Sequence, residues 1–259
     1  MRGNATRELE ARLLRPAGPE RFGPAELDGL PGPVCRHLAQ AIAPGTPLHT
    51  SGRLTQRGQI KVGRWLPFRA RQVLSPGHGF VWTARAAGVI AGTDRYLDGA
   101  GAMRWRLAGL VTVAAGDGPD VSRSAAGRAG AEAVCLPTAL LPRFGVRWSA
   151  TGDDQVTARY QVGETPLEVN YQLDPVGRIR SMVFDRWGDP DSSGSFAWYP
   201  FGGEITGYRI FDGVTIPSGG RLGWFFGTDR WPVGEFFRYQ ITELHLVTAP
   251  DPAAPQGSP

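Results

Sequence analysis

The chain has 259 residues, a formal net charge of +4 and 28 basic residues, of which one is a lysine. A chain of this length can bury a sizeable core, and β-rich chains of this size commonly form a single domain. No run approaches the roughly 18 apolar residues of a membrane-spanning helix, and the charged N-terminus lacks the apolar segment of a signal peptide, so we expect a soluble, cytoplasmic protein.

The composition also argues against nucleic-acid, metal and disulfide chemistry. The arginines stand singly in alternating segments, as Arg104 and Arg106 do, and strand periodicity places such residues on a solvated face. Cys35 and Cys135 lie far apart with no metal-ligand motif near either, and the four histidines lack mutual ligand spacing. We therefore predict two free thiols, no metal, no cofactor and no nucleic-acid partner. The oligomeric state stays open.

The first elements are helical. Residues 1–23 are polar, and we predict that they are flexible. Residues 24–42 place apolar side chains at mainly helical spacing, which predicts an N-terminal helix that Pro31 and Pro33 break or restart.

From about residue 48 the apolar side chains recur at every second position, which is typical of antiparallel strands with one buried and one solvated face. The inward set includes Leu66, Phe68 and Ala70, then Phe80, Trp82 and Ala84, then Met103, Trp105 and Leu107. Gln72 continues the first of these faces, so we expect a polar side chain that is satisfied by its neighbours or lines a cavity.

Residues 119–142 carry the one strong helical signal between two β-rich halves, and we predict a helix over 120–136. Asp120 is expected to cap its N-terminus. Glu132 falls on the stripe that should face the sheet, and Arg128 lies one turn earlier, close enough to pair with it. Two interpretations stay open: a structural ion pair, or a carboxylate that meets a ligand as acid or base.

The two-residue period returns after the helix. It predicts strands over 156–162 and 167–173, and residues 174–177 predict a tight turn before a returning strand. Asp185 breaks the apolar alternation of that strand, which indicates either an inward carboxylate or a bend.

The last part of the chain is rich in turn signals. Residues 188–203 are typical of a long loop, and Asp212 with Gly213 predicts a hairpin turn. A second turn is expected at the glycine pair 219–220, and residues 248–259 predict a disordered tail.

Aromatic side chains at alternate strand positions either pack in the core or line a cavity for an apolar ligand. The candidate catalytic residues are Glu132 and Asp185. The candidate ligand-binding residues are Arg69, Gln72, Trp82, Trp105, Arg128, Tyr171 and Trp224. In an enzyme, Arg69 or Arg128 would hold an anionic group.

Six segments together match a known pattern: 30–36, 65–72, 79–82, 101–105, 131–142 and 238–243. The most specific is 131–142, Ala-Glu-x-x-x-Leu-Pro-Thr-Ala-Leu-Leu-Pro. On these segments the chain resembles, over about residues 30–247, a bacterial family known only as a domain of unknown function. An aromatic residue often stands in that family where this chain has Cys135. The resemblance implies no particular reaction.

The order of elements is also similar to that of bacterial lipoprotein carriers: a leading helix, curved strands, a helical plug and more strands. That likeness implies an unclosed barrel that holds acyl chains, but a fold does not determine a function.

We therefore predict one α+β, mainly β domain over 24–247. It should be a strongly curved antiparallel sheet, an open or half barrel, with the central helix packed in its concave face. The leading functional hypothesis is the binding of a hydrophobic or amphipathic small molecule in a cavity between sheet and helix. One alternative is a cofactor-independent isomerase, cyclase or hydrolase that acts on such a molecule with a carboxylate acid/base. Another is a structural or partner-binding protein whose cavity is packed core.

Overall fold

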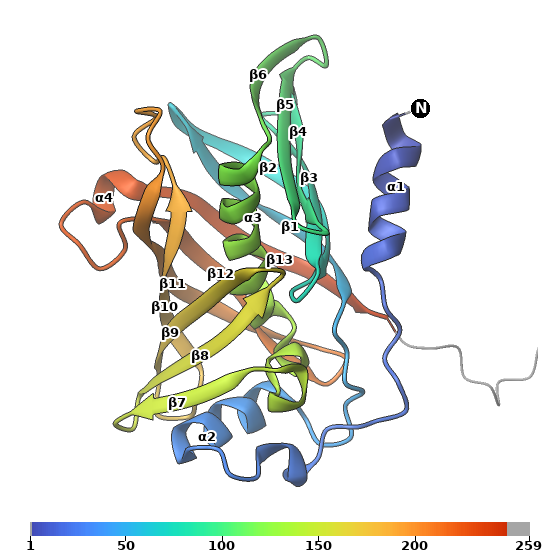
Figure 1. The fold of residues 1–259 in the computed structure, drawn as a ribbon, viewed down its shortest axis with the longest axis vertical. Helices are drawn as coiled ribbons and strands as arrows, with labels where there is room; N and C mark the ends of the chain where they lie inside the picture. The colour runs from blue at the N-terminus through green and yellow to red at the C-terminus, as the bar shows by residue number, and fades with distance from the viewer. Residues whose placement is uncertain (1, 248–259) are drawn as a thin grey trace, which may run out of the picture.

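The computed structural model of the chain describes residues 2–247, and its main feature is one antiparallel sheet of 13 strands (Figure 1). In chain order the strands are β1 Gly52–Val62, β2 Arg64–Ser75, β3 Gly79–Ala86, β4 Ile90–Leu97, β5 Ala100–Leu107, β6 Val111–Gly116, β7 Arg147–Thr151, β8 Gln155–Val162, β9 Thr165–Leu173, β10 Ile179–Gly188, β11 Ala197–Phe211, β12 Val214–Trp224 and β13 Glu235–Leu246. The predicted disordered tail, 248–259, lies outside the described residues.

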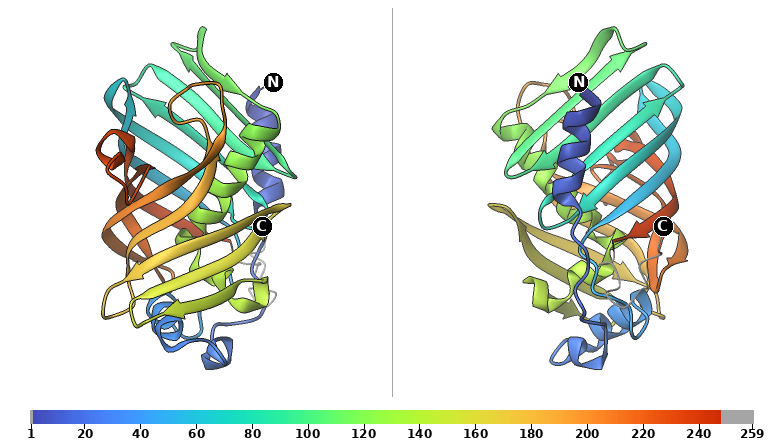
Figure 2. Two further views of the ribbon diagram at one scale, coloured as in Figure 1. Left: turned by 60° about the vertical axis from the view of Figure 1, so that its left-hand side comes forward. Right: turned by 90° about the vertical axis from the view of Figure 1, so that its right-hand side faces the viewer.

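The first strand, β1, lies in the interior of the sheet, next to the last strand, β13. Strands β1 to β6 add one after another by hairpins until β6 forms one edge of the sheet. The chain then crosses to the other edge, β7, and returns by hairpins to β13, which pairs with β1 so that Gly52 lies opposite Leu246. The two β-rich halves therefore belong to one sheet, which is curved and unclosed (Figure 2).

Helix α3, Pro119–Ala131, makes the crossing between the two edges and lies on the concave side of the sheet (Figures 1 and 2). Small residues let the helix approach the strands closely. A Cβ atom at Gly130 would lie 2.6 Å from Leu167 Cδ2, and one at Gly101 on β5 would lie 2.7 Å from the Cα of Ser122. The predicted curved sheet with a helix packed in its concave face is confirmed.

The other helices are short. They are α1 Arg2–Leu13, α2 Gly32–Ala41 and α4 Trp231–Gly234, with single 3-10 turns η1 Pro24–Leu27, η2 Glu132–Cys135, η3 Pro137–Leu140 and η4 Pro142–Phe144. The N-terminal helix expected over 24–42 is thus split into η1 and α2, and α2 begins in the stretch that holds Pro31 and Pro33.

Helix α1 departs from the flexible N-terminus that the sequence predicted. It lies on the convex side of the sheet, where Leu13 packs in a small cluster with Val73, Val81 and Leu97. Leu9 and Leu13 are the only large apolar residues of this helix, which is otherwise polar. So short an apolar stripe did not predict a packed helix, and the helix is held by the apolar patch on β2 to β4.

Two turn predictions have different outcomes. Asp212 and Gly213 form the expected hairpin turn, with φ of 43° and 86°. The glycine pair 219–220 is not a turn but lies inside β12. A Cβ atom at Gly220 would approach the carbonyl oxygen of Glu204 to 2.8 Å, so glycine is needed there for close strand packing.

Two predicted boundaries also move. The loop expected over 188–203 is shorter, because β11 already starts at Ala197. Helix α3 ends at Ala131 and continues as the 3-10 turn η2, and its N-cap is Gly118 rather than Asp120. Asp120 instead accepts a hydrogen bond of 2.8 Å from Trp187 Nε1.

Candidate functional site

The predicted pair of Glu132 and Arg128 forms at the C-terminal end of α3, on the side that faces the sheet. Arg128 Nε lies 2.8 Å from Glu132 Oε1, and its second nitrogen lies 2.9 Å from Oδ2 of Asp94 on β4. Between 18% and 26% of each of these three side chains is exposed. One guanidinium group therefore bridges two carboxylates in a mostly buried position.

Polar side chains from four strands complete the network around this pair. Gln72 donates a hydrogen bond to Glu132 Oε2 and accepts one of 3.0 Å from Gln56. Trp82 Nε1 donates to Gln56 Oε1 at 3.0 Å, and Trp105 Nε1 donates to Asp94 Oδ1 at 2.9 Å. Of the predicted site residues, the structure thus brings together Gln72, Trp82, Trp105, Arg128 and Glu132.

The chemistry of this network is that of fixed charges. The Arg128 guanidinium lies 4.5 Å from the centre of the Phe80 ring and 4.9 Å from that of Trp82. Burial opposes its charge, but the carboxylates of Glu132 and Asp94 outweigh burial and raise the pKa of Arg128. Both oxygens of Glu132 accept hydrogen bonds, Oε1 from Arg128 and Oε2 from Gln72.

Asp94 was not among the predicted site residues. It stands two residues after Gly92 and two before Tyr96, both buried, so it occupies an inward position of β4. The same signal that singled out Gln72, a polar residue on an inward face, would have found it once the alternation of β4 was recognised.

Two predicted candidates face away from the network. Asp185 and Arg69 are exposed on the convex face of the sheet, so the expectation of an inward Asp185 is wrong. The reason is an irregularity in the pairing of β10 with β9, between Ile179 and Ser181, which shifts the alternation by one residue. In the strand register, Arg69 lies opposite Arg57 on one side and Arg85 on the other, and all three are on that convex face.

The same shift turns Arg186 inward. Its guanidinium lies 4.6 Å from the ring centre of Phe201 and 5.1 Å from that of Trp224, and its Nε donates to the Ser124 carbonyl of α3 at 3.3 Å. Within the described residues it forms no ion pair with a carboxylate. Burial, followed by repulsion from Arg128, lowers the pKa of Arg186 to about 10, and the attraction of the Glu132 and Asp94 carboxylates only partly opposes this. Arg186 is therefore a charged group with unused hydrogen-bonding capacity.

Aromatic side chains surround Arg186 on the concave side. Trp224, a predicted site residue, packs at 5.1 Å and nearly perpendicular to Phe201, which also contacts Phe236. Phe237 stacks on Phe68 at 4.9 Å and on Tyr239 at 6.0 Å. Four of these side chains stay half-buried although they lie against the core: Trp224, Phe236, Phe237 and Tyr239. We call Arg186 and these four residues the aromatic face.

Tyr171, the last predicted site residue, lies elsewhere. It is buried in a separate aromatic group with His37, 6.3 Å away, and Trp148, 5.9 Å away. His37 comes from α2, so this group belongs to the packing of that helix against the sheet.

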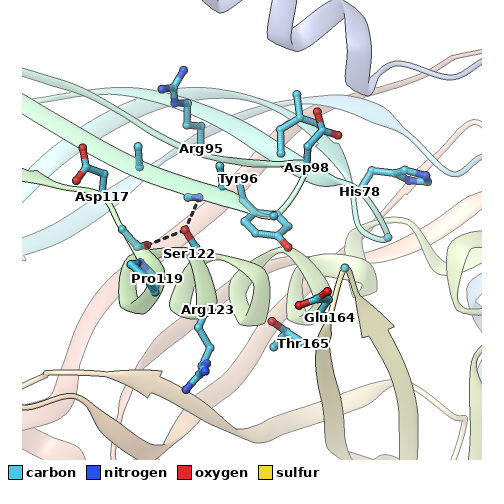
Figure 3. Close-up of a pocket in the computed structure, with 18 of the residues that line it drawn as sticks. His78, Arg95, Tyr96, Asp98, Asp117, Pro119, Ser122, Arg123, Glu164 and Thr165 are labelled. Carbon is cyan, nitrogen blue, oxygen red and sulfur yellow. Dashed lines mark hydrogen bonds between the residues drawn. The ribbon is translucent and has the colours of Figure 1, made fainter.

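A groove of about 1410 Å³ opens at the N-terminal end of α3 (Figure 3). Its walls carry charges of both signs, including Arg95, Asp98, Arg123 and Glu164. Ser122 in its floor donates to the Gly118 carbonyl at 2.7 Å and accepts from the Gly101 amide at 2.9 Å. None of the predicted site residues lines this groove.

Other kinds of site find no support in the described part of the chain. Among residues 2–247, no three His, Cys, Asp or Glu side chains are placed to hold a metal ion. No helix there is long and apolar enough to cross a membrane. Cys35 and Cys135 are both free thiols, and Cys135 is buried while Cys35 is half-buried.

Comparison with known proteins gives a family and two structures. A sequence model of a family of unknown function, DUF6544, matches residues 20–236. None of the curated proteins matches the chain. A domain described as an outer membrane lipoprotein-sorting protein, from Vibrio parahaemolyticus, is 10% identical, with a TM-score of 0.42 over 78% of this chain and 87% of that one. A LolA superfamily protein from Nitrosomonas europaea is 9% identical, with a TM-score of 0.44 over 83% of this chain and 92% of that one.

Proposed function

The chain belongs to the DUF6544 family of unknown function, and from the geometry of its concave side we propose that it binds a hydrophobic or amphipathic small molecule. The site is the aromatic face beside α3, and the Arg128 network lies next to it at the C-terminal end of the helix. The apolar body of the ligand lies on Trp224, Phe236 and Phe237, and an anionic group of the ligand pairs with Arg186.

The observation that carries this proposal is the state of Arg186. A mostly buried guanidinium is normally paired with a carboxylate, as Arg128 is with Glu132 and Asp94. Arg186 instead has aromatic rings and one carbonyl in direct contact, and the carboxylates of Glu132 and Asp94 act on it only from beyond ion-pair distance. Aromatic walls with one placed charge are the features of a site for a small molecule that has an apolar body and an acidic group.

The enzyme hypothesis has less support from the same geometry. A general acid or base must be free to exchange a proton with a bound substrate. The Glu132 carboxylate is held by Arg128 and Gln72, and Asp185 lies on the opposite face of the sheet. We therefore propose binding rather than catalysis, with Glu132 as part of the support beneath the site.

Two ligands that share the same hydrocarbon chain but differ in their head group test the proposal: oleic acid carries a carboxylate, and oleyl alcohol carries a hydroxyl. Oleic acid should raise the melting temperature and bind in a titration, and Arg186→Met should weaken its binding about tenfold, because a charge-assisted hydrogen bond is lost. Oleyl alcohol should bind the wild type and Arg186→Met equally. The control is Arg180→Met, an exposed arginine on the same strand, which should change neither affinity.

Trp224→Ala should weaken both ligands, since both lay their chain on the aromatic face. Native mass spectrometry of freshly purified protein gives a second readout, a co-purified mass in the wild type that Trp224→Ala loses. If neither ligand binds and the freshly purified protein carries no extra mass, the binding proposal is wrong. Equal weakening by Arg186→Met and Arg180→Met would refute the role of Arg186.

A further inference from the structure

A second feature of the fold lies outside the aromatic face, at the turn between β5 and β6. Apolar side chains protrude into solvent there, and Leu110 is 84% exposed and Val111 61% exposed. The exposed apolar residues at the β3–β4 and β5–β6 turns are Val89, Leu107, Leu110, Val111 and Val113, which we call the apolar tip. A contiguous exposed apolar group of this kind commonly marks a surface that contacts a partner or a membrane.

The sheet topology explains why these residues come together. In an antiparallel meander, alternate turns lie at the same end of the sheet, so the β3–β4 turn with Val89 and the β5–β6 turn with Leu110 are neighbours. Ile90 also lies directly opposite Leu107. Figure 1 shows the β5–β6 turn at the upper end of the molecule and α2 at the lower end.

Behind the apolar tip, the convex face of the sheet carries a set of arginines. Arg69 lies directly opposite Arg85, and like charges in such a position repel each other. The set consists of Arg69, Arg71, Arg85, Arg104 and Arg106, which we call the arginine face. None of the five forms an ion pair with a described carboxylate, and Nε of Arg106 is buried without a hydrogen-bond partner in the described chain.

Acidic residues are nearly missing from this part of the chain. Between Gly52 and Gly116 the sequence has ten Arg and Lys residues and two Asp residues. Asp94 points to the concave side and pairs with Arg128, and Asp98 pairs with Arg12 at the opposite turn, between β4 and β5. Strands β2 to β5 therefore contribute no unpaired acidic side chain to this convex face, and α1, which lies on it, adds Glu8 and Glu10 together with Arg7 and Arg12.

From the apolar tip and the arginine face together, we propose that this end of the protein docks on the surface of an anionic phospholipid membrane. The tip inserts Leu110 and Val111 into the boundary between head groups and acyl chains, and the arginines contact lipid phosphates. At about 3.3 Å per residue, Arg106 lies roughly 7 Å and Arg104 roughly 13 Å behind the turn, which matches the depth of the head-group region and the layer outside it.

The combination of the two features selects this partner over a nucleic acid. Phosphate backbones attract arginines, but they offer nothing to protruding aliphatic side chains. A membrane surface satisfies both, because apolar insertion and attraction to anionic lipids add to each other. The inference does not depend on the ligand proposed for the aromatic face, since the two surfaces share no residue.

Vesicle flotation with the full chain tests the proposal. The protein should float with vesicles of phosphatidylcholine and phosphatidylglycerol, should stay behind with phosphatidylcholine alone, and should be released by high salt. Leu110→Glu should lower partitioning at least tenfold. Arg104→Gln and Arg106→Gln should each lower it about fivefold.

Matched controls separate docking from general effects. Ile210→Glu changes an apolar residue that is 74% exposed but lies beside α2, where Ile42 bridges to Val214, so partitioning should not change. Arg147→Gln removes an exposed arginine from β7 and should have little effect. Melting temperatures confirm that each variant is folded.

Several results would overturn the inference. Among them are the absence of flotation with either vesicle, equal flotation with both, and equal effects of Leu110→Glu and Ile210→Glu. A dimer in light scattering that Leu110→Glu dissociates would assign the tip to a second copy of the chain instead. Binding of duplex RNA or DNA with no vesicle binding would also refute it. None of these outcomes bears on oleic acid binding, so the two proposals can fail separately.

Discussion

The substitution Glu132→Gln tests most directly whether the network under α3 supports the fold. Glutamine keeps the shape of the side chain but removes one of two carboxylates that face Arg128. A fully buried ion pair costs about 3–5 kcal/mol when one partner is removed, and an exposed pair costs about 1 kcal/mol or less. With 26% of the Glu132 side chain exposed, we expect a loss of about 2 kcal/mol in the free energy of unfolding.

Urea denaturation measures this loss, and for a chain of this length it corresponds to a fall of roughly 4–8 °C in the melting temperature. The matched control is Glu168→Gln, whose pair with Arg159 also has an oxygen to nitrogen distance of 2.8 Å but leaves 54% of the Glu168 side chain exposed. It should change the free energy of unfolding by about 0.5 kcal/mol or less.

A double-mutant cycle with Arg128→Met isolates the pair itself, and we expect a coupling energy of about 1–2 kcal/mol. If Glu132→Gln costs no more than Glu168→Gln, or if the cycle shows no coupling, the structural role of the pair is refuted. A gain in stability would be stronger evidence against it, because residues kept for activity are often replaced with a gain in stability.

Three further predictions concern other parts of the fold. Gly130→Ala should destabilise the fold by about 1–3 kcal/mol, since its Cβ atom would lie 2.6 Å from Leu167. Gly127→Ala on the same helix meets only ordinary contacts of 3.5 Å and should stabilise the fold by about 0.5 kcal/mol. Thermal melting of both variants measures the two effects. Burial lowers the pKa of His37 below 6.5, so the imidazole binds a proton more readily in the unfolded protein than in the folded one. The free energy of unfolding should therefore fall as pH drops below about 6.5. Urea denaturation at several pH values should show a smaller fall for His37→Gln. Burial also raises the pKa of Cys135, so an aromatic disulfide reagent should label half-buried Cys35 first, and equal rates in the native protein would contradict this.

The network around Arg128 shows how far local pattern reasoning reaches into the site. Helical spacing placed Glu132 and Arg128 on one face, and strand alternation placed Gln72 and Trp82 on the inward side, so their meeting follows from local periods alone. The salt bridge to Asp94 required knowing that β4 lies near α3 across the concave side. That placement is a property of the whole sheet, since β4 is three strands away from β1.

Arg186 shows where the same reasoning fails. Strict alternation from Ile179 points Asp185 inward, but one irregular pairing step before Ser181 exchanges the two faces from Met182 to Arg186. The sequence has no glycine or proline at that step to indicate it. A one-residue shift therefore places the Asp185 carboxylate on the convex face and the Arg186 guanidinium in the aromatic face.

The arginines show most clearly which properties belong to the sequence and which to the tertiary structure. Alternation in the sequence determined the strands, their solvated faces and most of the hairpin turns, because side chains of a strand point to opposite faces with a period of two. Alternation alone placed the arginines as single residues on separate strands and predicted no common role for them. Cross-strand register then brought Arg69 opposite Arg85 and gathered the others beside them. Register depends on pairing between distant segments, and only the folded sheet decides it.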